Sequence, residues 1–130
     1  MTQKPTVLFL CQHNAGRSQL GAGLLEVLAG DRYTATSAGL SPADAVNPAI
    51  AATVAELGLD ISDRTPRAVT VEDLETADIV VAMKPGLALP VTPTGRFLEW
   101  RFPDPTDWSA ESVRPLREAV AARIQAELLD

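Results

Sequence analysis

The chain has 130 residues, 46% of them hydrophobic and 22% charged, and its formal net charge is −6. This length predicts one domain, residues 1–130, that buries its own core. The negative charge and the lack of a strongly basic stretch argue against nucleic acid and anionic membranes as partners. No apolar run approaches bilayer-spanning length, the N-terminus lacks an apolar signal segment, and a lone cysteine suits a reducing compartment. We therefore expect a cytoplasmic location.

The first part of the chain predicts a strand, a loop, a helix and a second strand. The continuous apolar run Thr6–Leu10 predicts a short buried strand. From Arg17 the spacing of apolar residues is helical, and the helix is expected to stop near Gly30. Tyr33–Ser37 predicts the second strand. The expected core face of this first helix is made of leucines: Leu20, Leu24, Leu25 and Leu28.

Two further helices are marked by their first residues. Asn47 predicts an N-cap, with Pro48 at the first helical position and Gly58 at the end. The expected core face of this helix contains Ile50, Val54 and Leu57. Thr70 and Asp73 are spaced as in a capping box, which predicts a short helix before the next strand.

The second half completes an alternating pattern. Strands are predicted over Asp78–Met83 and Phe97–Trp100, separated by the irregular loop Lys84–Gly95, which is rich in proline and glycine. The last helix carries apolar residues every three or four positions and accommodates Pro115 only if that residue lies in its first turn. Alternating strands and helices predict a three-layer α/β/α fold around a four-stranded parallel sheet. The apolar positions of the last helix are Val113, Leu116, Val120, Ile124 and Leu128.

The segment between the first strand and the first helix has the features of an oxyanion site. Backbone N–H groups at a helix N-terminus have no partner within the helix, and the helix dipole adds partial positive charge there. An anion is the natural occupant. Asn14 and Gly16 accept left-handed backbone angles, which would let the loop curl around one centre. The expected binding residues are Gln12, His13, Asn14, Ala15, Gly16, Arg17 and Ser18.

Cys11 lies at the start of this loop and is the candidate nucleophile. A helix N-terminus and a nearby guanidinium favour the thiolate, which is the reactive form of cysteine. Arg17 would hold two oxygens of a tetrahedral anion, and Ser18 would donate a hydrogen bond to the sulfur. The alternative, a cysteine that only fills space in the core, fits this pattern less well.

Other side chains invite weaker interpretations. His13 is the only histidine, and its place in the loop favours a backbone N–H contribution over an imidazole base. One cysteine and one histidine two positions apart form no recognised metal-ligand set, so no metal is expected. Trp100 and Trp108 are candidates for the pocket wall, although core packing explains such residues equally well. Arg64 and Arg67 either guide an external ligand or are solvated surface residues.

The pattern C-x-x-N-x-x-R-S, from Cys11 to Ser18, resembles the low-molecular-weight tyrosine phosphatase family and the arsenate reductases that share its fold. The resemblance implies that Asp104 is the general acid, whereas from the residues alone an aspartate before proline is more typical of a turn. Further matches run along most of the chain: Ser37-Ala38-Gly39, Asn47-Pro48, the Ala77–Val81 segment and Asp104-Pro105.

Departures from the phosphatase pattern favour the reductase branch. Gly16 replaces a second cysteine of the loop, Gln19 replaces a proline, and Thr106-Asp107 replaces a tyrosine pair. The R-S-Q form looks like that of the arsenate reductases. Reductases that recycle through thioredoxin carry two more cysteines, and in the matching segment this chain has Met83 and Leu89.

A single cysteine sets a requirement for this chemistry. Reducing arsenate to arsenite takes two electrons, normally from two thiols, so the second thiol must be external. The resemblance implies no bound cofactor, a low-molecular-weight thiol such as mycothiol or glutathione, and a mycoredoxin or glutaredoxin-like protein that clears the mixed disulfide. The alanine-rich, lysine-poor composition favours mycothiol. Two alternatives stay open: a phosphatase that acts through a phosphocysteine, and a non-catalytic oxyanion or thiol sensor.

Overall fold

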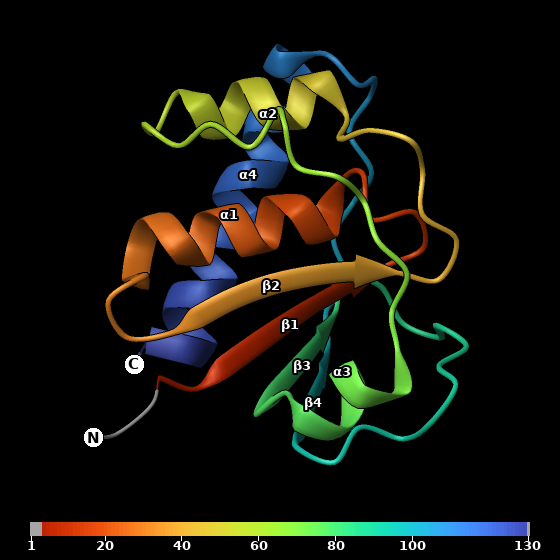
Figure 1. Ribbon diagram of the computed structural model, residues 1–130. Helices are drawn as coiled ribbons and strands as arrows, with labels where there is room; N and C mark the ends of the chain where they lie inside the picture. Colours follow the sequence, from red (N-terminus) through yellow and green to blue (C-terminus); the bar gives the residue numbers. More distant parts are fainter. Residues whose placement is uncertain (1–3, 130) are drawn as a thin grey trace.

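Four parallel strands form the centre of the computed structural model, which describes residues 4–129 (Figure 1). The strand order is β2-β1-β3-β4, and every neighbouring pair is parallel, which confirms the predicted sheet. Strand boundaries differ from the expected ones by one or two residues, as is usual for sequence patterns. The strands are β1, Thr6–Cys11; β2, Thr34–Gly39; β3, Ile79–Ala82; and β4, Arg96–Glu99.

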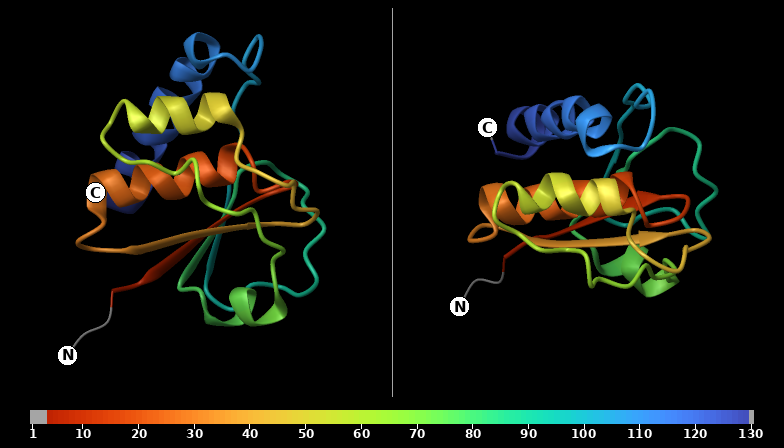
Figure 2. Two further views of the ribbon diagram at one scale, coloured as in Figure 1. Left: turned by 45° about the horizontal axis from the view of Figure 1, so that its top comes forward. Right: turned by 90° about the horizontal axis from the view of Figure 1, so that it is seen from above.

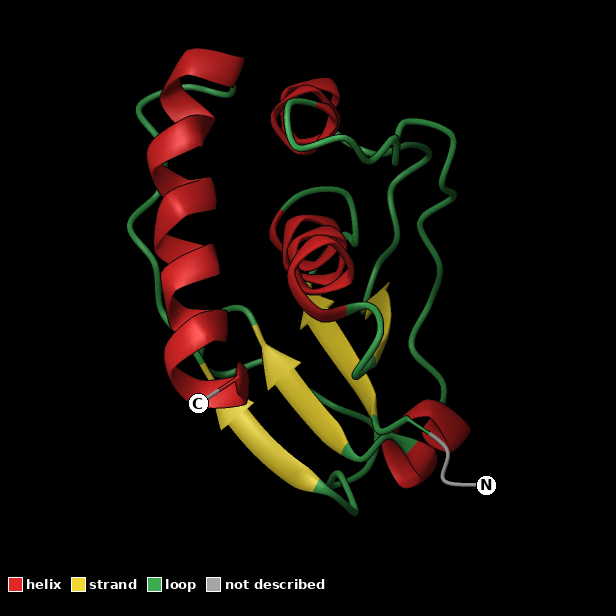
Figure 3. Cartoon of the chain, turned by 90° about the vertical axis from the view of Figure 1, so that its left-hand side faces the viewer, coloured by secondary structure: helices red, strands yellow, loops and turns green. Residues whose placement is uncertain are grey.

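Helices cover both faces of the sheet unequally. Three of them, α1 (Arg17–Ala29), α2 (Pro48–Ala55) and α4 (Ala110–Ile124), lie on one face, and α4 continues into a π-helical turn, η1 (Gln125–Leu129) (Figures 1 and 3). The short α3 (Val71–Thr76) lies on the opposite face. Seen from above in the right view of Figure 2, α2 overlies α1, and α4 runs alongside them. The expected three-layer arrangement is therefore confirmed.

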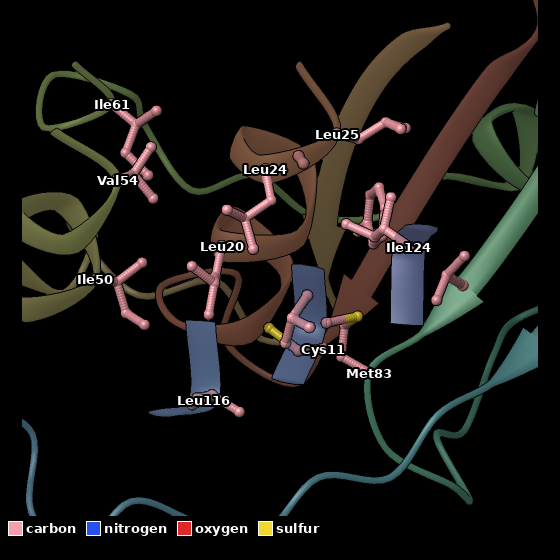
Figure 4. Close-up of a cluster of buried hydrophobic side chains, with 14 of the residues drawn as sticks. Cys11, Leu20, Leu24, Leu25, Ile50, Val54, Ile61, Met83, Leu116 and Ile124 are labelled. Atoms are coloured by element: carbon pink, nitrogen blue, oxygen red, sulfur yellow. The ribbon is translucent and has the colours of Figure 1, made fainter. Parts of the chain in front are cut away.

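The period-two alternation of β1 decides which way Cys11 points. Phe9 and Cys11 belong to the core that packs against α1, α2 and α4, whereas Leu8 and Leu10 belong to the smaller core with Leu74 of α3. Successive side chains of a strand point to opposite faces, so Cys11 shares the face of Phe9. Figure 4 shows Cys11 among the buried side chains of this larger core.

The predicted helix starts are confirmed by their hydrogen bonds. The Asn47 side chain accepts from the N–H groups of Ala49 and Ile50, and Pro48 occupies the first helical position. Thr70 and Asp73 form a reciprocal capping box at the start of α3. Each cap satisfies helix N–H groups that have no partner inside the helix.

Three expectations about helices are wrong, and two of them concern leucines that were expected on core faces. Leu28 and Leu57 are each 43% exposed. In the last turn of α1 the buried position is Ala29, four residues after Leu25 on the same face. Leu57 lies outside α2, because that helix ends at Ala55, before the predicted Gly58.

Pro115 is the third correction, because it lies in the interior of α4 and not in the first turn. Ser109 caps the helix, so Pro115 is the sixth helical residue. Its missing N–H leaves the carbonyl of Glu111 without that bond, but Glu111 is exposed and water can serve it. The five predicted apolar positions of this last helical segment are all buried: Val113, Leu116, Val120, Ile124 and Leu128.

Among residues 4–129, no helix has the length and apolar character needed to cross a bilayer.

Candidate active site

The candidate site lies where the strand order reverses. From β1 the chain continues to β2 on one side, while β3 and β4 lie on the other side. In open parallel sheets, ligands bind outside the carboxyl ends of the strands at such a point. A cavity of about 370 Å³ is found there, lined by residues that follow β1 and β3 and by parts of two later loops. Its lining residues are Cys11, Gln12, His13, Gly16, Arg17, Asn47, Met83, Lys84 and Trp108.

The sulfur of Cys11 is held by two polar groups. The Asn14 N–H donates to Sγ at 3.2 Å, and the Ser18 hydroxyl oxygen lies 2.9 Å from Sγ. The Asn14 side-chain amide donates to the same hydroxyl oxygen at 2.8 Å, so the single hydroxyl proton of Ser18 is free to point at the sulfur. Both contacts fix the sulfur beside the loop. The structure therefore brings together Cys11, Asn14 and Ser18 as the sequence predicted.

Asn14 holds the loop in its curled shape. Its φ of 53° is left-handed, and the residue is completely buried. Gln19 donates to its carbonyl oxygen at 3.1 Å, and the Arg67 N–H donates to its side-chain oxygen at 3.0 Å. Gly16, which was expected to adopt such angles as well, has a φ of −118°, so that expectation is wrong. One left-handed residue is enough to turn this loop.

The loop carbonyls point away from the cavity. Those of Gln12, His13 and Ala15 accept hydrogen bonds from N–H groups of the segment that follows β2. Because each peptide plane is fixed in this way, the N–H groups from Ala15 to Ser18 are left without a protein acceptor among residues 4–129. Such N–H groups at the start of α1 are suited to an oxyanion. The donors to the three carbonyls are Ser41 (2.7 Å), Ala43 (2.9 Å) and Asn47 (2.8 Å).

Gly39 allows the β2 end to approach this loop. A Cβ atom there would lie 2.7 Å from the Asn14 nitrogen and 3.0 Å from the Gln12 carbonyl oxygen. Real Cβ atoms essentially never come within 3.0 Å of another heavy atom. The absence of a side chain at Gly39 is therefore a steric requirement of the site.

Arg17, which lines the cavity, forms an ion pair with Asp104. The Arg17 side chain is 19% exposed and that of Asp104 is 80% exposed. The buried Nε of Arg17 has no protein partner within residues 4–129, so the guanidinium keeps a donor available. Asp104 lines a second cavity beside the first one, and Arg17 lines both. The predicted cation and the predicted acid are thus neighbours.

The remaining sequence candidates divide into cavity and scaffold residues. His13 lines the cavity, with its Nδ1 3.0 Å from the Ser41 carbonyl oxygen. Trp108 is 46% exposed, lines the cavity and packs next to Gly16, whereas Trp100 is buried in the core. The two tryptophans therefore have different roles.

Arg64 and Arg67 have carboxylate partners, Glu26 and Asp73 respectively. Burial by itself raises the pKa of Asp73, but hydrogen bonds from Arg67 and Thr70 outweigh it and lower that pKa. The ion pair holds Arg67 in the position from which its N–H supports Asn14. The sequence suggested a ligand guide or a solvated surface residue for Arg67, and support of the loop was in neither interpretation.

Sequence reasoning missed several residues of the site. Met83 and Lys84 line the cavity because they directly follow β3, and Asn47 reaches it from the start of α2. Placing the carboxyl end of β3 beside that of β1 would have found the first two. Gln19 is 2% exposed and donates to Asn14, and its polar side chain in an apolar helix was the available signal.

Comparisons with known proteins identify relatives over nearly the whole chain. The family described as low molecular weight phosphotyrosine protein phosphatase matches residues 6–128. An arsenate reductase of Brevibacillus brevis is 32% identical over 128 residues, covering 96% of this chain and 95% of that protein. A glutaredoxin arsenate reductase of Synechocystis is 30% identical and covers 92% of each chain.

Solved structures give the same picture. An arsenate reductase in the phosphate binding state has a TM-score of 0.80 and 30% identity, covering 94% of this chain and 95% of that one. The thioredoxin-dependent arsenate reductase of Corynebacterium glutamicum has a TM-score of 0.80 and 32% identity. That comparison covers 95% of this chain and 59% of the Corynebacterium chain.

Proposed function

The chain belongs to the low molecular weight phosphotyrosine protein phosphatase family, and from this premise we propose that it is an arsenate reductase. The observation that carries the proposal is the placement of Cys11 Sγ against the Asn14 N–H and the Ser18 hydroxyl, in a cavity that Arg17 also lines. A cysteine sulfur beside a guanidinium and N–H donors that have no protein acceptor within residues 4–129 is suited to attack a bound tetrahedral oxyanion. The similarity to arsenate reductases over nearly the whole chain favours arsenate as that anion.

In the first step, arsenate binds to the loop from Gln12 to Ser18, through the N–H groups of Ala15 to Ser18 that have no protein acceptor within residues 4–129 and through the Arg17 guanidinium. Cys11 Sγ attacks arsenic and forms an S–As bond, while one As–O bond breaks. Asp104 protonates the departing oxygen, which leaves as water. A positioned acid of this kind speeds such a step by about 10²–10⁴-fold. The closeness of Asp104 to Arg17 supports this role.

The second step needs a thiol from outside the chain, because the sequence contains a single cysteine. The external thiolate attacks Cys11 Sγ, an S–S bond forms and the S–As bond breaks. The bonding electron pair stays on arsenic, so As(V) becomes As(III) and arsenite is released. A redoxin then reduces the mixed disulfide at Cys11 and restores the thiolate.

The external thiol is proposed to be a low-molecular-weight one, either mycothiol with a mycoredoxin or glutathione with a glutaredoxin-like protein. The composition favours mycothiol, and the name of the Synechocystis relative points to the glutaredoxin route. Such thiols are kept reduced in the cytoplasm, which is the proposed location. One domain over 1–130 is proposed to hold the whole activity, without a bound cofactor or metal.

A phosphatase is the second candidate, since the family description names that activity and phosphate is a tetrahedral oxyanion like arsenate. Cys11 would form a phosphocysteine, and water would hydrolyse it. The absence of tyrosines after Asp104-Pro105 weighs against aryl phosphates as substrates.

One assay separates the candidates. The protein is incubated with arsenate or an aryl phosphate, with and without mycothiol or glutathione and the matching redoxin, and both arsenite and phosphate are measured. The proposal expects arsenite that depends on the thiol and is lost in a Cys11→Ser variant. Phosphate release without thiol would establish the phosphatase instead, and neither product would leave an oxyanion or thiol sensor.

A further inference from the structure

A second cavity of about 360 Å³ adjoins the one that contains Cys11. The two cavities share Arg17, Met83 and Lys84 as a common wall. The other residues that line the second cavity come from the segments that follow β3 and β4: Pro85, Arg101, Phe102 and Asp104. A group bound in this second cavity would therefore lie beside the cavity that contains Cys11 without filling that cavity.

The second cavity carries positive charge that the described protein does not neutralise. Within residues 4–129, Lys84 and Arg101 form no ion pair and both are exposed. The single carboxylate of the cavity, Asp104, is already paired with Arg17. Two uncompensated cations thus face one small cavity in a chain whose net charge is −6. In contrast, six arginines of the described chain have carboxylate partners: Arg17, Arg64, Arg67, Arg114, Arg117 and Arg123.

We propose that this second cavity binds a carboxylate of the external thiol, with Lys84 and Arg101 as its cationic partners. The inference rests on the proposed function, because it assigns a place to the thiol that completes the reaction. Of the two thiols proposed above, it selects glutathione, a small peptide thiol with free carboxylates, over mycothiol, whose polar part is a neutral sugar. The charge of the cavity thus points to the other thiol than the composition does.

Space and charge both support this assignment. Once arsenate is bound to Cys11, the first cavity is occupied and the thiol must approach from a neighbouring space. The shared wall makes the second cavity that space. A guanidinium and an ammonium group recognise carboxylates through charge-assisted hydrogen bonds, and Phe102 offers an apolar surface to the rest of the ligand.

The first test uses single-turnover arsenite formation with glutathione and with its dimethyl ester, which keeps the thiol but lacks the carboxylate charges. Exposed ion pairs contribute modestly, so two of them predict a preference of about tenfold for the free acid. A Lys84→Gln/Arg101→Gln double variant is expected to lose that preference. Arg96→Gln is the matched control, because Arg96 is exposed at the start of β4, away from both cavities, and has no ion pair within the described residues.

The second test measures binding without reaction. S-methylglutathione cannot attack the adduct, and isothermal titration should show that it binds the wild-type protein and the Arg96→Gln variant about tenfold more tightly than the double variant. Equal use of acid and ester by the wild type, or equal binding by all variants, would overturn the inference while arsenite formation still supported the proposed function. A higher KM for arsenate alone in the double variant would also overturn it, because the cations would then serve the oxyanion. If S-methylglutathione binds but no thiol yields arsenite, the carboxylate site in the second cavity is supported and the proposed arsenate reductase activity is refuted.

Discussion

The guanidinium of Arg17 is ion-paired with the carboxylate of Asp104, which connects the start of α1 to the loop that follows β4. Arg17 is mostly buried, whereas Asp104 is mostly exposed, so the arginine is the fixed member of the pair and the aspartate is the member that can yield. An arriving oxyanion would take over the guanidinium. Asp104 would then be left beside the anion, free to carry a proton.

This relationship predicts that Asp104→Asn impairs turnover without weakening the binding of arsenate. We expect kcat for arsenite formation to fall by about 10²-fold or more, because the acid is removed. The KM for arsenate should not rise, since the carboxylate that competes for Arg17 is gone. Asp107→Asn is the control, because the Asp107 side chain accepts from the Ser109 N–H and, within residues 4–129, lines neither cavity and forms no ion pair with Arg17. An equal loss of kcat in both variants would show that Asp104 has only a structural role.

Ser18→Ala tests the contact between the hydroxyl and the sulfur. A hydrogen bond to a charged group contributes about 1.5–3 kcal/mol, so alkylation of Cys11 by iodoacetamide at neutral pH should slow by roughly 10–100-fold. Ser62→Ala, at an exposed serine bonded to Asp60, should leave the rate unchanged. An unchanged rate in Ser18→Ala would show that the hydroxyl does not support the thiolate.

Gly39→Ala tests the close approach of β2 to the loop. The new Cβ would lie 2.7 Å from the Asn14 nitrogen, so the loop must shift. We expect arsenate binding to weaken more than tenfold while the protein stays folded, as judged by circular dichroism at 25 °C, because core substitutions that cause overpacking cost about 1–3 kcal/mol. Wild-type arsenate affinity in this variant would show that the loop does not need the glycine.

Glu56 predicts a specific loss of stability in acid. Hydrogen bonds from Arg114 and Arg117 of α4 lower the pKa of this carboxyl at the end of α2 from 4.5 to about 2. Because the pKa is lower in the folded protein, the stabilisation is complete above about pH 4.5 and is lost as the pH falls towards 2. The Tm should therefore drop more between pH 5 and pH 2.5 in the wild type than in Glu56→Gln. Glu75→Gln, at an exposed position of α3, should behave like the wild type.

Local signals predicted most of the framework. The apolar run before Cys11, the Asn47 cap and the Thr70–Asp73 box each depend on neighbouring residues, and each formed as expected. Leu57 was predicted to face the core, but α2 ends before this residue and its side chain is exposed. The end of a helix depends on tertiary packing, which the spacing of apolar residues does not reveal. Pro115 was misplaced for a related reason, since the start of α4 at Ser109 was not recognised.

The candidate site was predictable where it is contiguous in the sequence. The segment from Cys11 to Ser18 folds as one loop, so its members were found together. Residues brought in by the topology, such as Lys84 and Arg101, carry no local signature and are recognised only when the ends of β3 and β4 are placed beside β1. Arg67 was ambiguous because its contribution is made by a backbone N–H, which every residue type except proline supplies.

The central claim is that Cys11 attacks arsenic and is then released by a thiol from outside the chain. Intact-protein mass spectrometry after a single turnover with arsenate and glutathione, without redoxin, tests it most directly. We expect one glutathione per protein, attached to Cys11 and formed in step with one arsenite. Arsenite that accumulates while Cys11 stays unmodified, or a glutathione adduct that forms equally well without arsenate, would contradict the mechanism.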